Sequence, residues 1–241
     1  MLGDPDVSRG VITHARYVGD FNQEQFKKLL KAAVDIESAA GAAQVVYLAD
    51  GAPENWVVAN DVRPGATQIL DWYHAIENAM KCGRALLGEK NATALEFWKK
   101  GAECLLGQGH VELLVQTLME MTEGCKEVEL EALNDFVRYV RNNQTRMDYP
   151  SYRNHGFLIG SGPIESAQRH VIQVRMKRSG QRWGQKGARQ MARLRTALKT
   201  SGPEAFYRSI HWAYRETIRN RSALKKFALS RKLPKRRASN R

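Results

Sequence analysis

Three acidic residues stand where a folded chain could bring them together. Asp50 and Asp71 each close a short apolar run, and Glu165 lies in a segment typical of a helix start. A strand end and a helix start can both direct carboxylates into one crevice, and hard oxygen ligands suit Mg²⁺. The sequence therefore predicts a divalent-metal site of the kind that enzymes acting on nucleic acids use. The segments are Val45-Val46-Tyr47-Leu48-Ala49-Asp50, Thr67-Gln68-Ile69-Leu70-Asp71 and Gly160-Ser161-Gly162-Pro163-Ile164-Glu165.

These residues also have ordinary structural interpretations. Pro163 suits the first turn of a helix, where the helix dipole favours the charge of Glu165, but a glutamate there is also common in a capping box. Asp71 and His74 share a face if a helix starts between them, because they are three residues apart. On spacing alone, a helix N-cap and a hydrogen-bonded structural histidine are the better explanations of Asp71 and His74.

Hydrophobic periodicity predicts an α/β fold whose sheet has parallel members. A helix from about residue 22 to Gly41 separates the first two strands. From residue 72 to about residue 143 the helical period replaces the strand signals, which predicts a helical insertion between Asp71 and Glu165. The predicted strands are residues 11–18, 44–49 and 67–70.

After a Gly-rich turn, the chain is predicted to be helical again as far as about residue 220. The Glu165 helix carries an apolar stripe that we expect to be buried. Residues 225–241 contain too few apolar side chains to pack and are predicted to form a flexible tail. The stripe consists of Ile164, Ala167, Val171 and Val174.

The net charge of +13 is divided unevenly along the chain. Residues 166–241 contain 22 Lys and Arg against Glu204 and Glu216, a net of +20, which leaves the first 165 residues at −7. Such an excess favours a polyanionic partner over a merely solubilising surface, since Lys and Arg release counterions from phosphates. The candidate DNA-binding residues are Arg175, Lys177, Arg178, Arg182, Trp183, Lys186 and Arg189. Trp183 could stack on a base, but a core anchor is at least as good an explanation.

Three cysteines, Cys82, Cys104 and Cys125, show no C-x-x-C spacing and are expected to be reduced thiols. No apolar run is long enough to cross a membrane, and the first residues lack a signal-peptide pattern. The expected location is the cytoplasm, without a membrane partner.

Five short stretches, taken in order, give the chain a family resemblance. It resembles insertion-sequence transposases of the DDE type, within the Mutator-like assemblage and nearest to its bacterial Kra-type members. Each stretch is short, but the combination is specific and extends over most of the chain. The stretches are Leu48-Ala49-Asp50-Gly51-Ala52, Ile69-Leu70-Asp71-Trp72-Tyr73-His74-Ala75, Arg146-Met147-Asp148-Tyr149-Pro150, Ile159-Gly160-Ser161-Gly162-Pro163-Ile164-Glu165-Ser166 and Arg175-Met176-Lys177-Arg178-Ser179-Gly180-Gln181-Arg182-Trp183.

The resemblance implies a ribonuclease-H-like catalytic domain with an all-helical insertion and a helical basic C-terminal region. Asp50 would be the second catalytic carboxylate, Glu165 the third, and Asp71 with His74 the [C/D]-x-x-H element. Asp50 and Glu165 would bind Mg²⁺ or Mn²⁺ for cleavage and strand transfer at insertion-sequence ends and target DNA. The implied division is a partial sheet portion at 1–74, the insertion at 75–145, the remainder of the catalytic domain at 146–220 and a flexible basic tail at 221–241.

The first catalytic Asp of the family has no counterpart in this sequence. Asp4, Asp6 and Asp20 have no apolar strand before them, so we expect an incomplete two-metal site. The chain would then be the C-terminal portion of a transposase, inactive alone and dependent on a complementing N-terminal fragment or on a homo-oligomer.

Two other functions stay open at the level of sequence. The same basic region and the missing Asp fit a non-catalytic, transposase-derived DNA-binding or regulatory protein. The basic tail also fits an RNA-binding or ribosome-associated protein, although no RNA-recognition motif is present.

Overall fold

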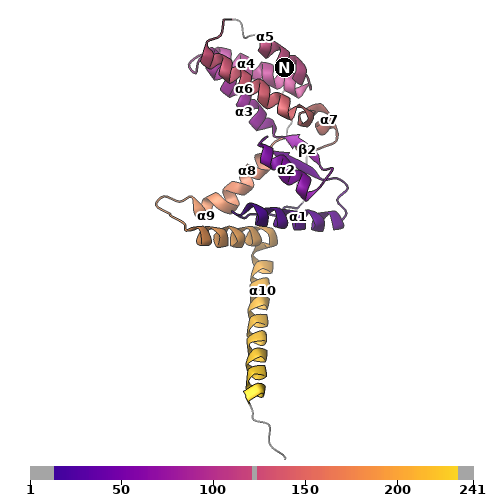
Figure 1. Cartoon of the computed structure of the whole chain (residues 1–241), viewed down its shortest axis with the longest axis vertical. Helices are drawn as coiled ribbons and strands as arrows, with labels where there is room; N and C mark the ends of the chain where they lie inside the picture. The colour runs from indigo at the N-terminus through magenta and orange to yellow at the C-terminus, as the bar shows by residue number, and fades with distance from the viewer. Residues whose placement is uncertain (1–13, 121–123, 233–241) are drawn as a thin grey trace, which may run out of the picture.

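The computed structural model describes residues 14–120 and 124–232, which are mostly helical and carry one small parallel sheet. Figure 1 shows a helical bundle at one end, the sheet in the middle and a long helix that projects from the other end. The elements are α1 Gln23–Ala39, β1 Val46–Ala49, α2 Pro53–Val62, β2 Thr67–Leu70, α3 Trp72–Leu87, α4 Ala92–Gly107, α5 Val111–Glu120, α6 Glu127–Asn143, α7 Tyr149–Asn154, α8 Gly162–Gln168, α9 Val174–Met176 and α10 Gln185–Lys232. A 3₁₀ turn covers Gln144–Arg146, and a π-helical turn covers Arg169–Gln173 between α8 and α9.

Strands β1 and β2 pair in parallel, as the two apolar runs predicted. Val46 pairs with Thr67 and Ala49 with Leu70, so both strands end at the same edge of the sheet. Helix α2 forms the crossover between them and buries Trp56 and Val58. Asp50, which follows β1, and Asp71, which follows β2, are therefore neighbours at this edge.

The bundle α3–α6 and the sheet share one apolar core. Helix α3 has the strong amphipathic pattern of a helix with one buried face, and Asp71 caps its first turn. Trp72 packs edge-to-face on Tyr149 at a ring-centroid distance of 5.0 Å, which joins the start of α3 to α7. Ile69 and Leu70 of β2 are fully buried in the same core. The described residues between 72 and 143 are mostly helical, as predicted for this stretch.

No disulfide involves Cys82, Cys104 or Cys125, in line with the expectation from their spacing. Cys82 is buried in α3, and this burial raises the pKa of its thiol to about 11. The thiol therefore stays protonated near neutral pH and behaves as a small apolar core group.

The strand predicted at residues 11–18 is wrong for its described part, because residues 14–18 adopt no strand conformation. This segment is held instead by side chains of two helices. The backbone amide of Tyr17 donates to Thr200 Oγ1 at 2.9 Å, and Arg16 pairs with Glu37 at 2.9 Å. Residues 11–13 lie outside the described residues.

The basic C-terminal region is more regular than predicted. Gly202, with φ 75° and ψ 163°, bends α10 just before Pro203, and the helix then continues to Lys232. The described part of the expected tail, residues 221–232, is therefore helical, whereas residues 233–241 lie outside the description. Figure 1 shows this second part of α10 extending away from the body.

The stripe expected to be buried in the Glu165 helix is buried only in part. Val171 is buried, but Ile164 and Val174 are exposed at 53% and 49%. The π-helical turn at Arg169–Gln173 explains the position of Val174, because a π turn rotates the residues that follow it relative to an α-helical stripe.

No helix in the described ranges has both the length and the apolar content needed to cross a bilayer.

The contact between α3 and α4 gives a stability prediction at Gly83. A Cβ atom there would lie 2.5 Å from Trp98 Cδ1, and the ring cannot easily move because Trp98 Nε1 donates to the Ala79 carbonyl at 2.7 Å. We expect Gly83→Ala to lower the free energy of unfolding by about 1–3 kcal/mol in urea denaturation. In the control Gly101→Ala, where a Cβ meets nothing within 4 Å, a gain of up to about 1 kcal/mol is expected. Equal stability of the two variants would contradict this packing.

Candidate functional site

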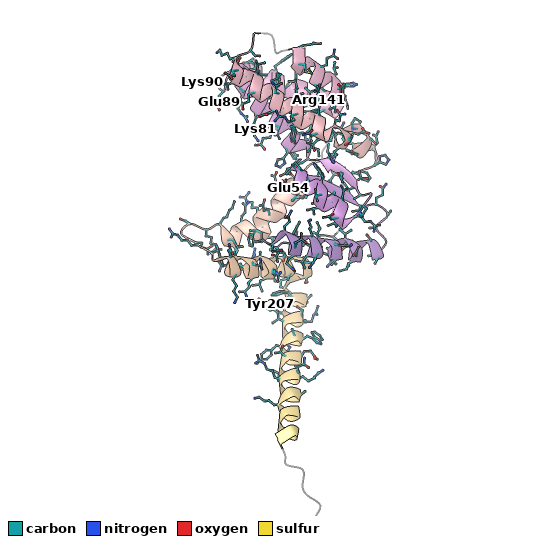
Figure 2. All side chains as sticks on the ribbon, in the orientation of Figure 1. Glu54, Lys81, Glu89, Lys90, Arg141 and Tyr207 are labelled. Atoms are coloured by element: carbon teal, nitrogen blue, oxygen red, sulfur yellow. The ribbon has the colours of Figure 1, made fainter. Side chains whose placement is uncertain are left out.

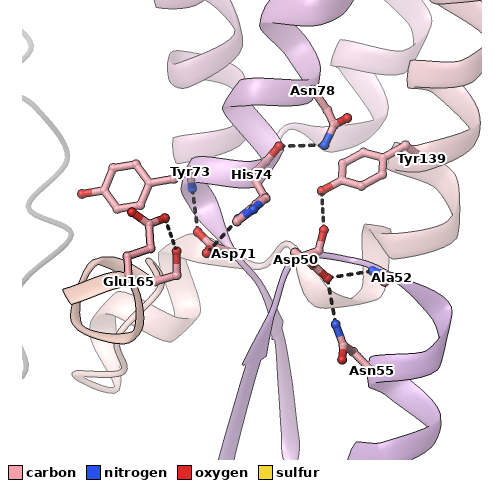
Figure 3. Close-up of polar contacts among 10 residues, drawn as sticks. Asp50, Ala52, Asn55, Asp71, Tyr73, His74, Asn78, Tyr139 and Glu165 are labelled. Carbon is pink, nitrogen blue, oxygen red and sulfur yellow. Dashed lines mark hydrogen bonds and ion pairs between the residues drawn. The ribbon is translucent and has the colours of Figure 1, made fainter. Parts of the chain in front are cut away.

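The candidate site lies at the edge of the sheet where both strands end. Asp50 follows β1 and Asp71 follows β2, and the amide of Asp71 donates to the Ala49 carbonyl at 2.8 Å. The next amide, that of Trp72, donates to the Ile159 carbonyl at 2.8 Å, which ties the segment before α8 to the same edge. Figure 3 shows the side chains of Asp50, Asp71, His74 and Glu165 around this edge.

Asp50 is exposed and held through one carboxylate oxygen. Its Oδ1 accepts hydrogen bonds from the Ala52 amide at 3.1 Å and from Asn55 Nδ2 at 2.8 Å, both at the start of α2. Its backbone carbonyl accepts from the Tyr139 hydroxyl of α6 at 3.3 Å. Within the described residues Oδ2 has no hydrogen-bond partner, so it is the oxygen available to a ligand.

Asp71 is buried, with 1% of its surface exposed, and uses both carboxylate oxygens. Oδ1 accepts the Tyr73 amide at 2.8 Å, which caps α3, and Oδ2 lies 3.1 Å from His74 Nδ1. Both ordinary interpretations, N-cap and hydrogen-bonded histidine, therefore hold in this structure. An ionised carboxylate only accepts, so a neutral His74 imidazole in this contact carries its proton on Nδ1 and has Nε2 as an acceptor.

Glu165 is exposed in the first turn of α8. The Ser161 hydroxyl donates to Glu165 Oε1 at 3.1 Å and makes no hydrogen bond to the backbone amides of the helix start. Glu165 Oε2 has no partner in the part of the chain that the structure describes. Like Asp50, Glu165 is fixed through one oxygen and free at the other.

The donor set suits a hard cation, but it is small. In the described residues no three side chains of His, Cys, Asp and Glu gather closely enough to hold a metal ion. Figure 3 shows Asp71 and His74 between Asp50 and Glu165, and Asp71 is already committed to its cap. The two free carboxylate oxygens fit Mg²⁺ chemically and need further ligands from elsewhere.

Tyr139 borders the site from α6 and remains a hydrogen-bond donor. Burial raises the pKa of its hydroxyl well above the ordinary value, and the carboxylates of Asp50 and Asp71 raise it further. The proton therefore stays on the oxygen throughout the neutral range, which preserves the bond to the Asp50 carbonyl.

The candidate DNA-binding residues lie on the segment that runs from α9 through the connecting turn into the start of α10, here called the basic hairpin (residues 175–189). Trp183 is fixed within it, because Nε1 donates to the Met176 carbonyl at 3.2 Å and the Arg175 guanidinium lies 5.4 Å from its ring centroid. This arrangement favours the anchor interpretation of Trp183. Lys177, Arg178, Arg182 and Lys186 are exposed.

Arg189, unlike these exposed residues, forms an ion pair within the protein. Together with Arg193 it encloses the carboxylate of Asp20, at 3.2 Å from Arg189 Nε and 2.9 Å from Arg193 Nε. The Asn22 amide and these two guanidinium groups hold the pKa of the Asp20 carboxyl below its ordinary value. Arg189 thus joins the N-terminal segment to α10.

Three residues that make hydrogen bonds at the site were not predicted from the sequence to do so: Asn55, Tyr139 and Ser161. The contact of Asn55 has a local sequence pattern, because a side-chain amide five residues after a strand-end Asp can donate a hydrogen bond to that carboxylate. Tyr139 carries none, because 89 residues separate it from Asp50. Ser161 belongs to the predicted helix start, a pattern that does not indicate its hydrogen bond to Glu165.

Comparisons with models of protein families, with curated proteins and with solved structures found no match to this chain.

The two hydrogen bonds of the Asp71 side chain can be tested with a pair of variants, Asp71→Ala and Asp71→Asn. Asp71→Ala removes the cap and the partner of His74, so we expect a loss of about 1–2 kcal/mol in the free energy of unfolding. Asp71→Asn keeps an oxygen for the Tyr73 amide and should lose clearly less. In ¹⁵N NMR of the imidazole, Asp71→Ala should release His74 from the Nδ1-protonated tautomer. An unchanged urea midpoint and an unchanged tautomer in Asp71→Ala would refute the assignment.

Proposed function

We propose that this chain is the C-terminal catalytic portion of a DDE-type DNA transposase with a ribonuclease-H-like core. Its reaction would be metal-dependent phosphodiester cleavage and strand transfer at the ends of an insertion sequence. The observation that carries the proposal is the meeting of Asp50, Asp71 and the segment leading to Glu165 at one edge of a parallel strand pair. The basic hairpin adds a positively charged surface beyond α9.

In this proposal, Asp50 and Glu165 hold Mg²⁺ or Mn²⁺ through the oxygens left free by Ala52, Asn55 and Ser161. The metal, when bound, would supply charge stabilisation for the attacking and leaving oxygens. Asp71 is a positioning residue that holds His74 by Nδ1. His74, 37% exposed at its side chain, presents Nε2 as a group that can accept a proton from water or a DNA 3′-hydroxyl.

The proposal requires a third carboxylate from outside the described residues. Two acidic ligands leave most of the coordination sphere of a Mg²⁺ ion to water and phosphate. We therefore propose that a complementing N-terminal segment, a second copy of the chain or both complete the site.

A non-catalytic DNA-binding or regulatory protein is the second candidate. It is favoured by the small number of metal ligands that converge in the described residues. Under this alternative the basic hairpin binds DNA and the carboxylates serve only the fold.

A metal-binding measurement distinguishes carboxylates that bind the metal from carboxylates that serve only the fold, and it requires no enzymatic activity. We expect the protein to bind Mn²⁺, measured as loss of the free-ion signal in electron paramagnetic resonance. Asp50→Asn and Glu165→Gln should each weaken binding by about tenfold or more, since each removes a charged ligand. The matched control is Glu54→Gln, an exposed first-turn glutamate of α2 that Figure 2 labels on the body. Equal Mn²⁺ affinity in all four proteins would exclude the proposed site.

Cleavage tests the reaction itself. The substrate is duplex DNA from the borders of the element that encodes the chain, incubated with Mg²⁺ with and without an added N-terminal segment that carries a strand-end Asp. We expect nicking or strand transfer in the complemented mixture, and its loss in Glu165→Gln at unchanged DNA affinity. DNA binding that weakens with salt, without cleavage under either condition, would support the non-catalytic alternative. Absence of duplex binding at low salt would remove both functions.

A further inference from the structure

The second part of α10, residues 203–232, is a helix with almost no support from the body, and we call it the arm. Every side chain from Tyr207 to Ala223 is exposed except that of Glu216, which is half-buried. Figure 2 labels Tyr207 near the base of the arm and shows side chains of the next turns extending from both sides of the helix. The described residues thus leave the arm free to meet a partner.

The arm presents two different lines of side chains. Arg208, Arg215 and Arg219 recur at spacings of seven and four residues, so they lie on one face of the helix. Trp212 falls on the same line, four residues after Arg208, and is 67% exposed. We call this face the basic stripe. A second line, roughly a third of a turn away, contains Tyr207, Ile210, Tyr214 and Ile218.

We propose that the basic stripe binds the phosphate backbone of duplex DNA, as a contact surface additional to the basic hairpin. The inference rests on the proposed function only in taking DNA as the partner, and it does not depend on catalysis.

Charge is the first argument for a polyanion. Residues 204–232 contain eight Lys and Arg against two Glu, a net of +6. Glu216 is paired with Arg219 at 2.7 Å, and Glu204 lies beside the bend. Arg208 and Arg215 have no ion-pair partner in the described residues. The basic residues are Arg208, Arg215, Arg219, Arg221, Lys225, Lys226, Arg231 and Lys232.

Shape is the second argument. At about 1.5 Å per residue, residues 203–232 form a rod about 45 Å long, and a helix with side chains is about 10–12 Å in diameter. The major groove of B-DNA is about 12 Å wide and admits such a helix. Arginines then face phosphates, and Trp212 adds a planar group beside them.

Two other partners fit less well. A second copy of the arm would bring two charges of +6 together, and the apolar line runs into Arg221 and Lys225. An anionic membrane favours a helix with its bulky apolar groups on one face and its cations on another. Trp212 breaks that pattern, because it shares its line with three arginines.

The test compares the salt dependence of DNA binding in two triple variants of the full chain. Fluorescence anisotropy with a labelled duplex gives the affinity at several salt concentrations. Arg208→Ala, Arg215→Ala and Arg219→Ala together should reduce the slope of log affinity against log salt by about two to three. The control, Lys81→Ala, Lys90→Ala and Arg141→Ala, removes the same charge from the bundle, where Figure 2 labels these residues, and should leave the slope unchanged.

Trp212 provides a local readout. Duplex DNA should protect part of the tryptophan fluorescence from acrylamide, and this DNA-dependent protection should be clearly smaller in Trp212→Phe, which retains Trp183 of the basic hairpin. Trp56 and Trp72 are buried and serve as the internal reference.

Different failures have different meanings. An unchanged slope and no protection of Trp212, with tight DNA binding that the hairpin variant Lys177→Ala, Arg178→Ala and Arg182→Ala weakens, would overturn the arm proposal and leave the proposed function standing. Protection of Trp212 by self-association in sedimentation, or by phosphatidylserine vesicles but not by DNA, would also overturn it. Absence of any DNA binding at low salt would defeat both.

Discussion

The buried carboxylate of Asp71 is the contact on which the arrangement of the candidate site depends. Its oxygens fix the first turn of α3 and the ring of His74, while its own amide completes the ladder to β1. The adjacent amide of Trp72 reaches the Ile159 carbonyl. Two consecutive residues thus join both strands, the bundle and the segment before α8. Because so many elements meet here, the relative positions of Asp50, His74 and Glu165 are set by a few short polar contacts.

The same contacts explain how one residue can serve both the fold and the site. A carboxylate that caps a helix from a buried position is too well satisfied to act as a free metal ligand. It can still orient a histidine, since Oδ2 faces Nδ1. Asp50 and Glu165 differ from Asp71 because each is exposed and holds only one oxygen in hydrogen bonds. Burial therefore divides the three carboxylates into one positioning group and two candidate ligands.

Much of this architecture could be predicted from the sequence, for identifiable reasons. β1 and β2 are short apolar runs with a polar residue at the end, and their parallel pairing follows from the helix between them. The bundle follows from helical periodicity over a long stretch. Predictions failed where tertiary contacts outweighed local pattern. Residues 14–18 alternate like a strand, yet Thr200 and Glu37 hold them by hydrogen bonds that no local pattern reveals.

The residues at the strand ends were easier to predict than their geometry. Residue type, position and the family resemblance selected Asp50, Asp71, His74 and Glu165, but not how many of the carboxylate oxygens would remain free. That number depends on partners such as Asn55 and Ser161, whose bonds form only in the folded chain. Tyr139, far away in sequence, instead holds the backbone carbonyl of Asp50. Arg189 shows the same limit, because only the folded chain brings it to Asp20. For Trp183 the sequence allows a base-stacking group or an anchor, and its contacts with Met176 and Arg175 favour the anchor.

The bend at Gly202 and Pro203 has a thermodynamic consequence for the arm. Beyond Phe206 at its base, the described side chains of the arm bury no apolar face and the arm gains little from tertiary structure, so its persistence depends on intrinsic propensity, local ion pairs and length. The arm and the bundle are then separate cooperative units, and mild heating should uncoil the former while the latter stays intact. Any partner that lies along the arm would couple its own binding free energy to this local helix–coil equilibrium.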